Sequence, residues 1–185
     1  MAPSANSPAP PPSWTARLHP DEVLVHEARY SLPSSTTELA ACGLEWDAVA
    51  VTPLERGLSA LDVLGLPVDA GVPVLADYVR GELVVLVAPG TGGAAADVPG
   101  VRVLAAGAWL LLPVRGQGAM AAAWLSAPDP QRPKYGDVTA LREALLRTDA
   151  DRVDRSERTF HAMLRRPGVE ASTARPVGSR PLVGT

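Results

Sequence analysis

The chain has 185 residues, with 17 basic and 20 acidic side chains and a formal net charge of −3. This acidic balance argues against strong non-specific binding to nucleic acid. The one cysteine, Cys42, excludes an intramolecular disulfide and a zinc site built from several thiolates. Lys134 is the one lysine, and the wealth of Arg, Ala, Gly, Pro and Val is typical of a GC-rich bacterial coding sequence.

Proline and glycine interrupt both ends of the chain, in residues 1–20 and 167–185. Such stretches form neither helices nor sheet ladders, so we expect two disordered tails. The residues between them, 21–166, are enough to bury one hydrophobic core. We therefore expect a single domain over 21–166, with its core in 44–148.

Local start and stop signals mark the first elements. Ser35–Glu38 fits a capping box and predicts a short helix that ends at Gly43. Trp46–Val51 is apolar and predicts a strand. Thr52–Glu55 is a second capping signal, with Thr52 as N-cap, and the leucines after it recur at helical spacing until Gly65.

Short apolar runs rich in β-branched residues follow, and turn residues separate them. The first two predict a hairpin that turns near Arg80–Gly81, and Ala105–Gly107 predicts a turn between the next two. The predicted strands are Val74–Ala76, Leu83–Val87, Val101–Leu104, Trp109–Leu112 and Ala121–Leu125.

Two amphipathic stretches end the domain. Asp137 is placed to cap a helix with Val138, Leu141, Ala144 and Leu145 on one side, and a second helix is predicted over Asp151–Arg166. The fold class is therefore α/β of the α+β kind. It has a mixed or mainly antiparallel sheet of about five to six strands and three to four helices.

Two glycine patterns have the form of known functional motifs. Gly90–Ala95 matches the loose pattern G-x-G-x-x-A after a strand, but no long helix follows it to receive a pyrophosphate. Gly57–Leu61 begins like a nucleophile elbow, but Ser59 lies inside a predicted helix. We predict no cofactor site from either pattern.

The sequence also offers no catalytic or metal-ligating constellation. His19, His26 and His161 have no metal-ligand spacing, and nothing local supplies a base for Cys42. Asp77 ends an apolar strand, where a carboxylate can serve catalysis, but we expect it to cap a turn.

Three tryptophans, Trp46, Trp109 and Trp124, lie in predicted strands. An exposed aromatic face on a sheet can stack nucleic-acid bases, whereas large aromatics more often fill the core, which we favour. We name Trp109, Arg102, Asp77 and Trp124 as candidate interaction residues.

Two segments resemble a known family. Arg80–Pro89 (RGELVVLVAP) and Gly100–Pro113 (GVRVLAAGAWLLLP) are similar to the later half of the bifunctional DNA primase/polymerase N-terminal domain. That family has a Gly-rich turn into an apolar strand ending in Pro, then Gly-Val-x-Val/Leu and an aromatic-apolar strand ending in Pro. Uncharacterised proteins of GC-rich bacteria share Trp46–Val49 as well, so the resemblance covers roughly residues 46–125.

The sequence departs from the family where catalysis takes place. The family holds divalent metals with Asp-x-Asp or Asp-x-Glu pairs at strand ends. Here Asp149–Asp151 has that spacing but lies in the expected turn between the last two helices, and the family's histidine position falls on Leu83. The resemblance therefore implies a degenerate, non-catalytic relative that needs no metal.

We expect a binding or adaptor module that contacts protein or nucleic acid. The alternatives are an enzyme whose site gathers scattered residues such as Asp77, Glu82, Arg102 and His161, or an active primase/polymerase-type nucleotidyltransferase. A third reading is a structural or regulatory partner protein that docks through Asp151–Arg166. Residues 141–185 carry a charge of +3 (9 basic minus 6 acidic), which can attract an anion, although we favour the interpretation that these charges only solvate the helix and tail. We expect no signal peptide, no membrane contact and a cytoplasmic location.

Overall fold

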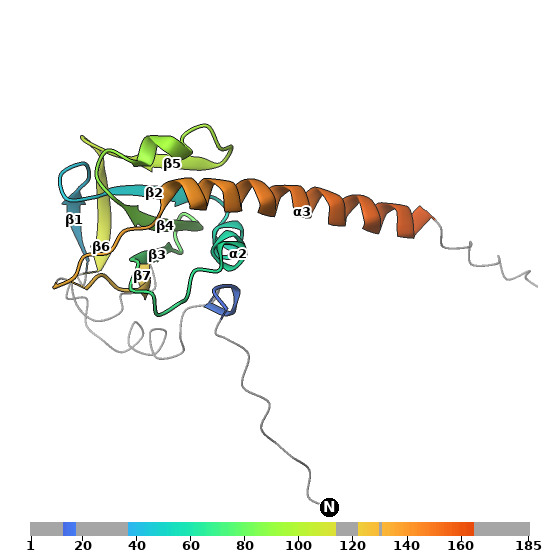
Figure 1. The fold of residues 1–185 in the computed structure, drawn as a ribbon, viewed down its shortest axis with the longest axis horizontal. Helices are drawn as coiled ribbons and strands as arrows, with labels where there is room; N and C mark the ends of the chain where they lie inside the picture. Colours follow the sequence, from blue (N-terminus) through green and yellow to red (C-terminus); the bar gives the residue numbers. More distant parts are fainter. Residues whose placement is uncertain (1–12, 18–36, 114–121, 130, 165–185) are drawn as a thin grey trace, which may run out of the picture. The chain divides into compact units, whose positions relative to one another are not determined.

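The computed structural model describes residues 13–17, 37–113, 122–129 and 131–164 (Figure 1). The chain divides into two units, Met1–Arg152 and Val153–Thr185. The first unit is an α+β fold with two antiparallel sheets, which confirms the predicted class. Its strands are β1 (Thr37–Ala41), β2 (Asp47–Val51), β3 (Val74–Asp77), β4 (Glu82–Val87), β5 (Val101–Leu104), β6 (Trp109–Pro113) and β7 (Ala122–Ser126).

The larger sheet has the strand order β5-β2-β4-β3-β7, so β4 is its central strand. Strands β3 and β4 form the expected hairpin, with Asp77 opposite Glu82. Gly81 takes the left-handed conformation, with a φ of 64°, in the turn between them. The predicted turn and the apolar runs on either side of it are thus confirmed.

Both faces of this sheet are covered. Helix α2 (Leu54–Leu64) and the first turns of α3 pack on one face, where Val49, Leu83 and Val85 are buried. Strands β1 and β6 pair only with each other among the described strands, and this two-stranded ribbon packs on the other face (Figure 1). Because both faces are buried, β2, β3 and β4 are apolar except for one acidic residue at an end of each strand, and they do not alternate with polar residues.

Helix α2 ends as the sequence predicts but begins differently. Gly65 adopts the left-handed conformation, with a φ of 70°, as the C-cap. The N-cap is Pro53 rather than Thr52, and no side chain caps the helix. The Thr52 hydroxyl instead points toward Glu82. Gly57 lets the helix approach the sheet, since a Cβ there would lie 2.6 Å from the Cβ of Leu83.

Strand β1 corrects the helix predicted after Ser35–Glu38. Thr37–Ala41 is extended and pairs with β6, with Leu39 opposite Leu111. The local capping signal is therefore overridden by pairing with a strand far along the chain. The turn at Ala105–Gly107 is present, but β5 and β6 belong to different sheets rather than pairing with each other.

The two helices predicted at the end of the domain are one. Helix α3 runs without a break over Val138–Leu164, so Asp149–Asp151 lies within it and not in a turn. The predicted cap is confirmed, because Asp137 Oδ1 accepts hydrogen bonds from the backbone N–H groups of Thr139 and Ala140. The described part of the chain therefore has two α-helices where three to four were expected.

A short segment near the N-terminus also joins the first unit. Ser13–Arg17, which falls in the expected disordered tail, includes a 3-10 turn, η1 (Thr15–Arg17). Trp14 is 1% exposed and belongs to the core on the α2 side of the sheet.

Candidate functional site

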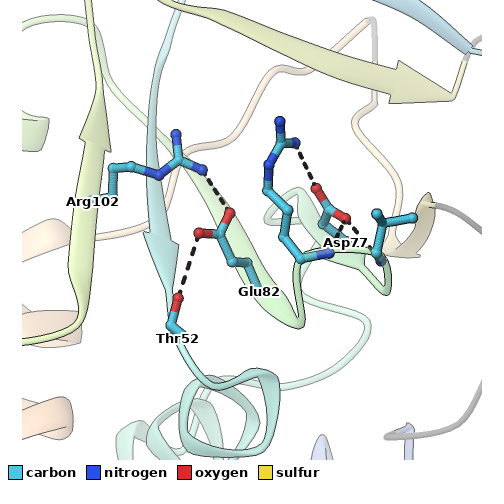
Figure 2. A network of polar contacts seen from close by, with 6 residues as sticks. Thr52, Asp77, Glu82 and Arg102 are labelled. Carbon is cyan, nitrogen blue, oxygen red and sulfur yellow. Dashed lines mark hydrogen bonds and ion pairs between the residues drawn. The ribbon is translucent and has the colours of Figure 1, made fainter.

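Charged side chains form a row across one end of the larger sheet (Figure 2). Asp77 ends β3 and Glu82 begins β4 directly opposite, so the two carboxylates are cross-strand neighbours. Arg102 on β5 reaches the same row, since it lies opposite Ala50 of the intervening strand β2. The fold thus brings together Asp77, Glu82 and Arg102 from three strands, although they are scattered along the sequence.

Asp77 is fixed by the turn that follows it. Its Oδ1 accepts hydrogen bonds from the backbone N–H groups of Val79, at 3.1 Å, and Arg80, at 2.9 Å. Its Oδ2 accepts a bond of 3.0 Å from Nη1 of Arg80. The expected role of Asp77 in capping a turn is therefore confirmed.

Glu82 is held from the other side. Arg102 Nη2 donates to Glu82 Oε2 at 2.6 Å, and the Thr52 hydroxyl lies 3.5 Å from Glu82 Oε1. Both carboxylates are nearly buried, whereas the side chains of Arg80 and Arg102 are 61% and 48% exposed. The row therefore consists of two buried acids, each neutralised by an arginine at the surface.

The ion pairs of this row favour a role in stabilising the sheet over a role in binding a metal or transferring a proton. A divalent metal binds several free carboxylate oxygens, but here an arginine already occupies each carboxylate. Within the described residues, no three His, Cys, Asp or Glu side chains are placed to share a metal ion. A general base is also disfavoured, because the charge of each acid is already committed to a cation.

The glycine loop after β4 contacts the carboxylate of Asp47, which lies on β2. Asp47, 1% exposed at the start of β2, accepts a hydrogen bond of 3.2 Å from the backbone N–H of Gly92 through Oδ2. Gly92 begins a 3-10 turn, η2 (Gly92–Ala95), so part of this loop has regular structure. The backbone N–H of Gly92 therefore already donates to the Asp47 carboxylate, whereas a phosphate bound at Gly90–Ala95 would need that donor.

Cys42 is buried beneath the ribbon, 2% exposed. Burial raises the pKa of its thiol, the nearby charge of Asp47 raises it further, and Arg102 opposes the shift. A raised thiol pKa leaves less thiolate at neutral pH, so Cys42 is a packing residue rather than a nucleophile.

The remaining candidate residues are divided between core and surface. Trp124 is 8% exposed and its Nε1 donates to the Pro113 carbonyl at 3.2 Å, so it is not available to a partner. Trp109 is 61% exposed, so the expectation that the tryptophans fill the core is wrong for this residue. His161 lies on α3 within the second unit, and His19 and His26 lie outside the described residues.

The surroundings of Trp109 form an apolar patch on the outer face of the ribbon. Trp109 lies opposite Ala41, and Leu111 lies opposite Leu39, which is 64% exposed. Leu110 and Leu112 point inward to the core. Because side chains alternate along a strand, Trp109 and Leu111 point outward, together with the β1 residues opposite them. We call Leu39, Ala41, Trp109 and Leu111 the ribbon patch. Sequence reasoning missed Leu39 because it expected a helix there.

Comparisons of this chain with family models, with curated proteins and with solved structures found no match. None of the helices in the described part of the chain is both long and apolar enough to cross a bilayer.

Proposed function

We propose that this chain is a non-catalytic, protein-binding module and that the ribbon patch is its binding surface. The carrying observation is that Trp109 and Leu39 are 61% and 64% exposed on one face of a two-stranded ribbon. Exposed tryptophan and leucine side chains that share a face are typical of protein contact sites. A relationship to the primase/polymerase N-terminal domain is part of this proposal, with the binding role in place of nucleotide chemistry.

The charge around the patch favours protein over nucleic acid. Among β1, β6 and the loops 42–46 and 105–108, the charged side chains are Glu38 and Glu45, and both are acidic. Phosphate contacts need arginine or lysine beside the stacking aromatic, and these segments supply neither. A partner with an apolar surface and a basic rim fits this face best.

The state of the polar row supports the non-catalytic part of the proposal. The carboxylates of Asp77 and Glu82 are cross-strand neighbours on β3 and β4, and each is bound by an arginine. An enzyme that used them would have to break both ion pairs before binding a metal or a proton.

A photo-crosslinking amino acid at position 109 tests the proposal in the native host. We expect it to yield a discrete protein adduct, and we expect Leu39→Asp to abolish that adduct. The same crosslinker at Phe160, which is also 61% exposed but lies in the second unit, is the matched control. Adducts from position 160 alone would instead support docking through Asp151–Arg166.

Two other outcomes would contradict the proposal. Binding to single-stranded oligonucleotides that persists at physiological salt would favour a nucleic-acid role. Template-dependent nucleotide incorporation that Asp77→Ala abolishes would show an active nucleotidyltransferase.

A further inference from the structure

The N-terminal segment Ser13–Arg17 is held on α2 by a dense set of contacts to one carboxylate. Asp62 Oδ1 accepts a bond of 2.7 Å from the backbone N–H of Trp14. Asp62 Oδ2 accepts bonds from the backbone N–H of Thr15, at 3.1 Å, and from the hydroxyls of Ser13 and Thr15, at 2.7 and 2.9 Å. Three consecutive residues therefore converge on a single side chain.

Trp14 anchors this segment in the core. It is 1% exposed, and its indole Nε1 donates to the Leu66 carbonyl at 2.7 Å. Of its neighbours along the chain, Thr15 is exposed and Ser13 is half-buried. A buried tryptophan that fills a pocket and is surrounded by polar contacts is the kind of anchor that concentrates binding energy at protein interfaces.

We infer that the surface formed by Asp62, Leu66 and the end of α2 is a peptide-recognition site, which this chain fills with its own Ser13–Trp14–Thr15. The same geometry accepts a segment of the pattern hydroxyl–Trp–hydroxyl from another protein when the chain's own segment is withdrawn. We call this surface the Trp14 socket. It is independent of the ribbon patch.

The Trp14 socket has room beside the segment that fills it. A hollow of about 510 Å³ adjoins it, lined by Ser13, Asp62 and the residues 65–69. That volume is in the range of small-ligand and side-chain pockets. A peptide that continues beyond the tryptophan can therefore occupy surface that the chain's own segment leaves open.

The chain's own segment competes strongly because it is tethered. Residues 18–36 join it covalently to β1, so its binding is intramolecular, whereas a free peptide must first associate. A free peptide of similar affinity is excluded until the segment is released. The chain's own segment therefore blocks the Trp14 socket. A partner peptide binds there only if it displaces this segment or if the segment has already been removed.

Asp62 makes the contact sensitive to acid. Burial acts to raise the pKa of this carboxyl, but the hydrogen bonds from Ser13, Trp14 and Thr15 outweigh it and lower the pKa. A lowered folded-state pKa stabilises the contact above the ordinary aspartate value of about 3.9, and the stabilisation is lost as the pH falls through the folded-state value. The segment therefore stays bound at neutral and mildly acidic pH.

A cleavable tether tests the inference while leaving every residue of the Trp14 socket unchanged. A protease site is inserted within residues 18–36 of the full chain, and the chain is cut after folding. The probe is a fluorescent peptide of residues 11–18, PPSWTARL. We expect the cut chain to exchange its own segment for the probe and the uncut chain to bind the probe at least tenfold more weakly.

Matched variants identify the contacts. Asp62→Asn should weaken probe binding to the cut chain at least tenfold, as should replacing the tryptophan of the probe by alanine. Glu55→Gln, which removes an exposed carboxylate from the first turn of the same helix, should have little effect. Two results would overturn the inference. One is a cut chain whose segment never exchanges in native buffer, and the other is probe binding that is unaffected by Asp62→Asn.

Discussion

The guanidinium of Arg56 in α2 holds the carboxylate of Asp149 in α3 through two hydrogen bonds, Nε to Oδ1 at 2.8 Å and Nη2 to Oδ2 at 2.7 Å. The Arg56 side chain is 6% exposed and that of Asp149 is 38% exposed. Removing Asp149 therefore leaves a buried cation unpaired, whereas removing Arg56 leaves an anion that water can reach. We expect Asp149→Ala to cost about 3 kcal/mol of unfolding free energy and Arg56→Met clearly less.

Urea unfolding followed by tryptophan fluorescence measures both variants. Asp151→Ala, on the same helix with an exposed side chain, is the control and should leave the midpoint unchanged. Equal losses for Arg56→Met and Asp149→Ala would show that burial of the arginine does not decide the cost.

The two arginines of the polar row should differ in importance. Without Arg102, the contact to Glu82 that remains among the described residues is the long one to Thr52, whereas without Arg80, Asp77 keeps two backbone N–H donors. We expect Arg102→Met to cost roughly 2 kcal/mol and Arg80→Met under about 1 kcal/mol. Thermal unfolding by circular dichroism compares them, and the reverse order would contradict this account of the row.

Gly92 and Gly93 are adjacent in the η2 turn but differ in the space around them, so alanine substitutions at the two positions can be compared directly. A Cβ on Gly92 would lie 2.7 Å from Cγ1 of Val103 and 3.3 Å from Oδ2 of Asp47, whereas a Cβ on Gly93 would meet nothing within 4 Å. Gly92→Ala should therefore destabilise the fold by about 2 kcal/mol through overpacking, and Gly93→Ala should be nearly neutral. Denaturant titration of the two variants checks this contrast.

Cys42 should be unreactive in the folded protein. Because burial raises its thiol pKa, the thiolate is scarce at pH 8, and the side chain is also shielded. Ellman's reagent should modify it slowly in native buffer and at once in guanidinium chloride. Rapid native labelling would place the thiol at the surface.

Local signals predicted the elements that local chemistry stabilises. The hairpin around Gly81, the end of α2 at Gly65 and the Asp137 cap all depend on neighbours within a few residues. Asp77 was correctly expected to cap a turn for the same reason.

Contacts between distant residues explain what the sequence did not reveal. Strand β1 carries a helix signal but pairs with β6, and Trp14 follows a proline-rich stretch but binds Asp62 and Leu66. The pairing of Glu82 with Arg102 depends on strand order, which no local pattern contains. Asp149 lies within the continuous helix α3 and not in the predicted turn, and its bond to Arg56 in α2 joins residues far apart in the sequence.

The ribbon has a consequence for how the molecule folds. Its strands are separated along the chain by all of β2 to β5, so closing it costs more loop entropy than closing the β3–β4 hairpin. Packing of the ribbon against Val84 and Leu86 offsets that entropy cost, and this packing requires the larger sheet to have formed first. Amide protons of β1 should accordingly gain protection from exchange after those of β4 during refolding, so the face that we assign to partner binding would be assembled last.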